Sequence, residues 1–245
     1  MRLLVTRPLA DAMPLAEQLA GQGHDVVVSP LINIALDTQA SMPPAAAHGA
    51  LAFTSANGVR AFMAQWQAHK MTSEEMVAWH ELPVFAIGPQ SAAAAQAAGF
   101  ATIHQAAGEL AALAQLIGAH YHAALPVLHI AGRHRAGDLA ALLDEKAVPA
   151  QRVVLYHAEA ASAFSDVARA ALCDAEEPVE GVLLYSQRSA AIFLALYEAL
   201  PPHPEARPTA YCLAPPIADT MREAGFAAQA PVTVDSAALL ELLAV

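Results

Sequence analysis

The chain has 245 residues, enough for one large domain or for two of about 120 residues. Hydrophobic residues make up 56% and charged residues 14%, so we expect a sizeable core and no extensive disorder. The net charge of −11 argues against binding to nucleic acid through bulk electrostatics, and two cysteines without metal-ligand spacing argue against a disulfide scaffold or a zinc site.

Short apolar runs alternate with helical patterns along the whole chain. These runs predict strands at residues 2–6, 26–29, 50–53, 84–87, 102–104, 125–130, 152–156, 181–185, 210–214 and 229–232. Helices are expected after most of these strands, with Pro89 in the first turn of one helix and glycines closing others near residues 21 and 99. Strands separated by helical patterns of about 10 to 15 residues indicate parallel sheets built from βα units.

Two segments interrupt this alternation. Residues 35–49 lose their periodicity and contain Met42-Pro43-Pro44, which is typical of a linker. Residues 157–179 show no strand pattern, although part of this stretch is expected to be helical. We therefore predict two linker segments in the chain.

The expected location follows from what the sequence lacks. No uninterrupted apolar run reaches the length of about 18 residues that a membrane helix needs. Residues 1–8 contain Arg2 and Arg7 but no long apolar run and no cleavage signature, so a secretory signal is not indicated. A cytoplasmic protein is the expectation.

The sequence also repeats itself. Residues 84–100 match residues 210–226 without a gap, including Pro89 with Pro215 and a closing Ala-Gly-Phe in both. Residues 53–62 match 184–193, and residues 2–30 resemble 126–157. Three ordered matches at similar offsets indicate a duplication and therefore two related lobes, with a working site expected in the cleft between them.

Polar and basic residues follow the predicted strands, where ligands bind in doubly wound sheets. The stretches are 6–7, 54–58, 88–91, 132–135, 156–157 and 186–189. Arginines stand at or just after these ends, namely Arg7, Arg60, Arg133, Arg135 and Arg188. Helix N-termini and arginine side chains both favour carboxylates or phosphates, so the pattern predicts an anionic ligand.

Simpler interpretations exist for single members of this set. Ser55 and Ser186 precede helices, where a serine often serves only as an N-cap. Tyr156 ends a buried-looking strand and is compatible with a core tyrosine whose hydroxyl is satisfied. The chain has no G-x-G-x-x-G, P-loop or G-x-S-x-G motif, no metal-binding histidine pattern and no carboxylate pair at the strand ends.

At this point the pattern resembles the uroporphyrinogen-III synthase family over nearly the whole chain. The resemblance rests on the ordered stretches 5–8, 53–59, 86–88 with 91–92, 132–133, 154–156 and 185–186. It implies an α/β fold of two flavodoxin-like lobes with parallel sheets, joined by a two-segment linker. Lobe one would be residues 1–34 plus 180–245 and lobe two residues 50–156, with 35–49 and 157–179 as linkers.

The resemblance also implies a reaction. Linear hydroxymethylbilane, which carries eight carboxylates, would lose its hydroxyl and close to uroporphyrinogen III with its last pyrrole ring inverted. No cofactor and no metal are implied, and the enzyme would be a monomer. Tyr156 matches the family tyrosine credited with helping the hydroxyl to leave. The family positions and the strand-end residues together give the candidate substrate-binding set: Arg7, Thr54, Ser55, Asn57, Gly88, Ser91, Gly132, Arg133, Ser186 and Arg188.

The chain departs from the family pattern in its C-terminal part. Cys212-Leu213-Ala214 stands where the other lobe has Ala86-Ile87-Gly88, and Ile217 replaces the usual threonine. Ala214 adds a Cβ where a backbone would approach a ligand, which puts the lobe-one side of the pocket in doubt. The alternative function is a non-catalytic, two-lobed receptor or sensor for a small anionic metabolite.

Overall fold

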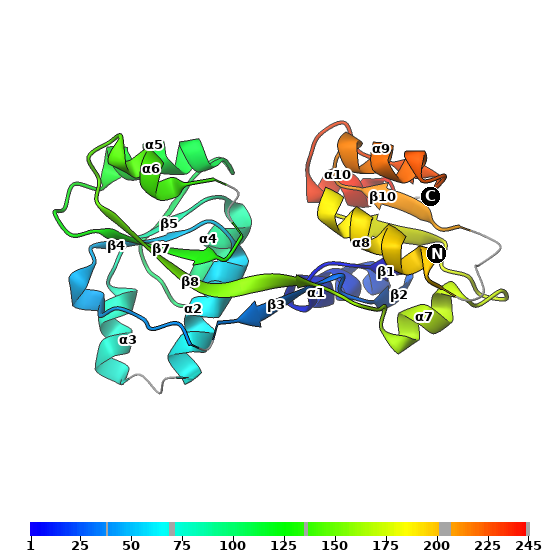
Figure 1. The fold of residues 1–245 in the computed structure, drawn as a ribbon, viewed down its shortest axis with the longest axis horizontal. Helices are drawn as coiled ribbons and strands as arrows, with labels where there is room; N and C mark the ends of the chain where they lie inside the picture. Colours follow the sequence, from blue (N-terminus) through cyan, green and yellow to red (C-terminus); the bar gives the residue numbers. More distant parts are fainter. Residues whose placement is uncertain (38, 69–71, 135–136, 201–206, 244–245) are drawn as a thin grey trace. The chain divides into compact units, whose positions relative to one another are not determined.

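The computed structural model describes residues 1–37, 39–68, 72–134, 137–200 and 207–243. The chain forms two compact units, each with its own sheet (Figure 1). Unit 1 comprises Met1–Asn33 and Glu159–Val245, and unit 2 comprises Ile34–Ala158. The chain therefore leaves unit 1, completes unit 2 and returns to finish unit 1.

Unit 1 is a doubly wound sheet. Its strands are β1 (Arg2–Val5), β2 (Asp25–Val28), β9 (Gly181–Leu184), β10 (Thr209–Cys212) and β11 (Ala228–Gln229). They are parallel in the order β11-β10-β9-β1-β2. The described helices are α1 (Leu9–Gly21), α7 (Asp166–Leu172), α8 (Gln187–Glu198), α9 (Pro215–Glu223) and α10 (Ser236–Glu241). Core clusters place α1 and α10 on one face of the sheet and α7, α8 and α9 on the other.

Unit 2 contains the second sheet. Its strands are β3 (Ile32–Leu36), β4 (Ala50–Phe53), β5 (Val84–Ala86), β6 (Ile103–Gln105), β7 (Val127–Gly132) and β8 (Ala150–Ala160), in the order β3-β8-β7-β4-β5-β6. Neighbours from β8 to β6 pair in parallel. The described helices are a short 3-10 helix (Ala45–Ala47), α2 (Ala56–Ala68), α3 (Ser73–His80), α4 (Pro89–Ala97), α5 (Leu110–His120) and α6 (Leu139–Asp144).

Both faces of this second sheet are covered, which explains the composition of its strands. The four residues of β4 are all buried, as expected for a parallel strand between two helical layers. Phe62 and Trp66 lie four residues apart on α2, and with Trp79 of α3 they pack on one face. Helices α5 and α6 cover the other face through residues such as Leu113 (Figure 1).

The expected α/β architecture with parallel sheets is confirmed, and the differences concern single elements. Strand β3 was not predicted, because Asn33 interrupts its short apolar pattern. Strand β8 is longer than the predicted 152–156, since its last residues pair without being apolar enough to signal a strand. Helix α3 was not separated from α2 in the sequence, although Thr72 caps it with a full capping box.

The segments 35–49 and 157–179 are largely folded onto the units. Within unit 2, the Asp37 N–H donates to the Leu155 carbonyl at 2.8 Å. His48 is 2% exposed and makes hydrogen bonds with the Pro44 carbonyl and the Gln151 side chain. In unit 1, the second segment contributes Phe164 and the α7 residues Ala168, Ala171 and Leu172 to the core. The chain passes between the units within β3 and β8.

The two sheets repeat one strand order. Unit 1 reads β2-β1-β9-β10-β11, and unit 2 reads β8-β7-β4-β5-β6 with β3 added at its edge. Each pair of segments matched in the sequence occupies the same place: β10 with β5, β9 with β4, and β1-β2 with β7-β8. In unit 1 the order by chain position is 2-1-3-4-5, which is that of flavodoxin-like sheets. The binding edge of unit 2 is therefore expected where β7 and β4 diverge into helices.

Within the described part of the chain, no helix combines the length and the apolar character needed to cross a membrane.

Candidate active site

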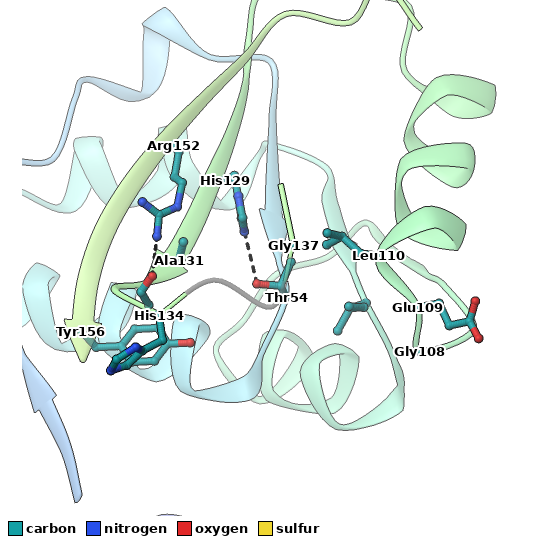
Figure 2. Close-up of a pocket in the computed structure, with 12 residues that line it drawn as sticks. Thr54, Gly108, Glu109, Leu110, His129, Ala131, His134, Gly137, Arg152 and Tyr156 are labelled. Atoms are coloured by element: carbon teal, nitrogen blue, oxygen red, sulfur yellow. Dashed lines mark hydrogen bonds between the residues drawn. The ribbon is translucent and has the colours of Figure 1, made fainter. Parts of the chain in front are cut away.

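A cavity of about 410 Å³ lies in unit 2 at the carboxyl edge of its sheet (Figure 2). Its walls come from β7 and β8, from the residues that follow β4 and β5, from the loop after β7 and from the start of α5. The lining residues are Thr54, Ile87, Gly108, Glu109, Leu110, His129, Ala131, Gly132, His134, Gly137, Arg152 and Tyr156. The cavity therefore sits at the switch point that the strand order indicates.

The strands bring three polar side chains together on the sheet side of the cavity. His129 of β7 stands opposite Arg152 in the register of β7 and β8. Thr54 directly follows β4, the other neighbour of β7, and its hydroxyl is 3.2 Å from Nε2 of His129. The imidazole is only 6% exposed, so this contact is largely shielded from water (Figure 2).

The position of the Tyr156 ring depends on the absence of a side chain at Gly132. A register shift between Ala131 and Gly132 pairs Gly132 with Tyr156, and the Arg133 N–H donates to the Tyr156 carbonyl at 2.9 Å. A Cβ on Gly132 would lie 2.9 Å from two carbon atoms of the Tyr156 ring and 3.2 Å from its hydroxyl oxygen. Any side chain at position 132 would therefore displace the ring.

The environment of Tyr156 keeps its phenol protonated. The residue is 8% exposed, and burial raises the pKa of its hydroxyl above the ordinary value. A hydrogen bond with the Ser55 hydroxyl and the positive charge of Arg152 lower the pKa but do not cancel the effect of burial. Near neutral pH this side chain is therefore protonated, and such a phenol is able to donate a proton inside the cavity.

The start of α5 forms another wall. Gly108 holds a positive φ of 97°, and its N–H donates to the Ile87 carbonyl at 2.7 Å. No described side chain caps this helix, and its positive dipole end lies beside the lining residues Gly108 and Leu110. The carboxylate of Glu109 is exposed at this end of the cavity. Together with Arg152, the helix end makes the cavity favourable for an anion.

A family model for uroporphyrinogen-III synthase HemD matches residues 13–241. The chain belongs to the uroporphyrinogen-III synthase family. It is a cyclising lyase of tetrapyrrole synthesis that forms uroporphyrinogen III from hydroxymethylbilane, and its substrate is a small tetrapyrrole molecule. The alternative of a non-catalytic receptor is not favoured.

Solved structures of the same family share the fold. The uroporphyrinogen-III synthetase of Helicobacter pylori aligns with a TM-score of 0.64 at 18% identity, covering 99% of this chain and 98% of that one. A mutant uroporphyrinogen III synthase of the extremely thermophilic bacterium Thermus thermophilus aligns with a TM-score of 0.51 at 16% identity, covering 99% and 97%. Among curated proteins the sequence finds no match.

Only some of the candidate residues predicted from the sequence line this cavity. Thr54, Gly132 and Tyr156 line it, and Ser55 reaches it through its hydrogen bond with Tyr156. The Ser55 hydroxyl also accepts from the Asn57 N–H at 3.1 Å, so it begins α2 as well. Ser55 therefore both accepts a backbone hydrogen bond at the start of α2 and contacts Tyr156, the candidate catalytic residue.

Other candidates in unit 2 lie outside the lining. The Asn57 side chain accepts from Arg60 at 2.8 Å. Gly88 precedes α4 as its N-cap, and Ser91 is 3% exposed within that helix. Arg133 is exposed and lies 3.6 Å from a carboxylate oxygen of Asp37. Arg135 lies outside the described residues.

The remaining candidates belong to unit 1. Arg7 lies 3.4 Å from the Asp11 carboxylate, and its guanidinium stands 4.6 Å from the centre of the Tyr185 ring. The Ser186 hydroxyl accepts from the Ser189 N–H at 3.0 Å and caps α8, and Arg188 is exposed in the first turn of that helix. Of the two departures from the family pattern, Ala214 is the N-cap of α9 and Ile217 is buried in the core.

Sequence reasoning did not select the most buried polar groups of the cavity as substrate-binding candidates. His129 interrupts the apolar run Val127–Gly132, and a polar residue inside a buried parallel strand is a signal that could have been used. Arg152 pairs with His129, but the register shift at Gly132 lies between the pairing positions of Arg152 and Tyr156, so strand periodicity alone does not place these two side chains together. Among the described residues no group of three or more histidine, cysteine or acidic side chains could hold a metal ion.

Proposed function

We propose that the unit 2 cavity holds the reacting end of hydroxymethylbilane and that Tyr156 is the proton donor of the synthase reaction. The observation that carries this proposal is a buried, protonated phenol that shares a cavity with a guanidinium and a helix N-terminus. A volume of about 410 Å³ is at the lower end of small-molecule sites, so the cavity takes part of the bilane rather than the whole chain.

The phenol has a defined task in the first step. Tyr156 donates its proton to the leaving hydroxyl, the carbon–oxygen bond breaks, and water departs from a cationic azafulvene. Attack by the last pyrrole ring then gives a spiro intermediate, whose rearrangement inverts that ring and closes the macrocycle. The proton released on rearomatisation returns to the phenolate, so the enzyme ends the cycle unchanged.

Positioning supplies much of the remaining rate, because ring closure is intramolecular and gains from holding the two ends of the bilane in a reactive geometry. The substrate carries eight carboxylates, and the N–H groups at the start of α5 suit one of them. Arg7, Asn57, Gly88, Ser91, Arg133, Ser186 and Arg188 stay predicted substrate contacts of this synthase. A monomeric state and a cytoplasmic location likewise stay predictions, as does the absence of nucleic-acid partners.

The decisive experiment identifies the product isomer. Purified protein is incubated with hydroxymethylbilane, and the uroporphyrin isomers are separated after oxidation. We expect the type III isomer in excess over the type I isomer, which forms spontaneously. Type I product alone would refute the proposed function.

A further inference from the structure

We propose that Arg152 and His129 form a carboxylate subsite, a binding place for one carboxylate of the bilane on the sheet side of the cavity. The proposal rests on the proposed function, because it names the group by which the same cavity holds its substrate. It assigns a specificity-determining role to two residues that were not among the predicted contacts.

The geometry of neighbouring strands brings the two groups together. His129 and Arg152 are partners in the β7–β8 register, and both side chains line the cavity (Figure 2). Arg152 donates a hydrogen bond of 2.5 Å to the Gly132 carbonyl, which fixes the direction of its guanidinium. A guanidinium carries five N–H donors in a planar fork, so it can bind a backbone carbonyl and a carboxylate at once.

The charges around the subsite favour an anion. The charged groups among the described lining residues are Arg152 and the exposed Glu109, with His129 and His134 as the titratable imidazoles. Arg152 is partly buried and His129 is nearly fully buried, whereas Glu109 is in water, where its charge is screened. The positive charge therefore acts on a bound carboxylate more strongly than the negative one does.

The duplicated unit shows that the fold does not require these polar groups. Residues 53–55 match residues 184–186, so Ala52 corresponds to Leu183. Ala52 pairs with His129 in unit 2, and Leu183 pairs with Val5 in unit 1. The next strand extends the match, because His129 pairs with Arg152 and Val5 pairs with Val28. Two valines thus occupy the positions of His129 and Arg152.

A carboxylate held here would lie beside Tyr156, since Arg152 already acts electrostatically on that phenol. Binding at the subsite would therefore fix the pyrrole that carries the carboxylate next to the proton donor. Near neutral pH Tyr156 is protonated with or without Arg152, because the arginine lowers a pKa that burial has raised. Loss of Arg152 should consequently weaken binding of the substrate far more than it slows the chemical step.

The test compares Arg152→Gln and Arg152→Lys with wild type in steady-state kinetics with hydroxymethylbilane near neutral pH. We expect Arg152→Gln to raise KM about tenfold to a hundredfold with little change in kcat, because a charge-assisted hydrogen bond is lost. Arg152→Lys should recover part of the loss, since it keeps the charge but not the fork. The wild-type KM should rise with ionic strength, and the Arg152→Gln KM should rise less.

Arg169→Gln is the matched control, because Arg169 is exposed on α7 in unit 1 and lies 3.6 Å from Asp166. Its KM should equal that of wild type. An unchanged KM in Arg152→Gln, or a fall in kcat and melting temperature without a change in KM, would overturn the subsite and assign Arg152 a structural role. If the subsite is overturned in this way, type III product from the wild-type protein in the same experiment would still support the proposed function.

Discussion

The two units have the same strand order but different carboxyl edges. In unit 2 the edge is open and carries Arg152, His129 and Tyr156 around a cavity. In unit 1 the corresponding strands end in apolar residues, and Arg7 is engaged by Asp11 and by the ring of Tyr185. A shared fold thus fixes where a site can form, while a few polar substitutions on neighbouring strands decide whether it does.

Several substitutions test this difference between the two units, and the largest change in kcat is expected for a substitution of Tyr156. Tyr156→Phe removes the proposed proton donor and keeps the ring, so kcat should fall by about a hundredfold or more while folding is intact. Steady-state rates and the thermal unfolding midpoint measure the two consequences.

Tyr211→Phe serves as the control for this change, because Tyr211 is a buried tyrosine of unit 1 whose hydroxyl is 3.9 Å from the Met1 sulfur. Its rate should match that of wild type. Equal rates for Tyr156→Phe and wild type would show that Tyr156 is a core residue without a catalytic role.

Gly132→Ala should have the next largest effect. The new methyl group would meet the Tyr156 ring at 2.9 Å, so the ring must move away from its place in the cavity. We expect a loss of kcat that approaches that of Tyr156→Phe, together with a destabilisation of about 1 to 3 kcal/mol from overpacking. Denaturant unfolding and kinetics on one preparation measure both.

Gly21→Ala is the matched glycine control in unit 1. A Cβ at Gly21 has nothing within 4 Å, and the residue ends α1 without a positive φ. This variant should keep its activity and be as stable as wild type or slightly more so. If Gly132→Ala behaved in the same way, the packing of Tyr156 against the backbone would not matter for the reaction.

The matched serines offer a smaller and more selective contrast. Ser186 in unit 1 caps α8, so Ser186→Ala should lower the free energy of unfolding by about 1 kcal/mol. Ser55 in unit 2 also bonds to Tyr156 and lowers its pKa, so Ser55→Ala should raise that pKa further. The alkaline limb of the kcat/KM profile would then move to higher pH, because the protonated phenol persists longer.

The pH profile of Ser186→Ala is the control for that of Ser55→Ala, because the Ser186 hydroxyl makes no described hydrogen bond to a tyrosine. A shift to lower pH in Ser55→Ala, or no shift, would contradict the described coupling between Ser55 and Tyr156.

Sequence patterns predicted the architecture well, because alternating βα units and the duplicated stretches determine the strand order. They also selected Thr54 and Gly132, which stand where strands end, whereas Tyr156, which lies inside β8, was selected through the family resemblance. They did not select Arg152 or His129 as binding residues, because both lie inside strands and are joined only by the β7–β8 register. That register depends on a pairing between segments distant in the sequence, and single-strand patterns do not contain it.

The smallest expected effect concerns the stability of the whole chain at high pH. Burial raises the pKa of all five tyrosines, three of them in unit 1 and two in unit 2. A raised pKa means that the folded state holds the phenol proton more tightly than the unfolded state does. The resulting stabilisation is complete below the ordinary tyrosine pKa of about 10 and is lost as pH rises through the folded-state values.

Urea unfolding at several pH values from neutral to strongly alkaline measures this loss. The free energy of unfolding should fall with pH above about 10, and Tyr156→Phe should flatten part of the fall by removing one titrating group. Because unit 1 contains three of the tyrosines, a probe in unit 1 should report the larger decrease if the units unfold separately. Stability that rises in this range would contradict burial of the phenols in both units.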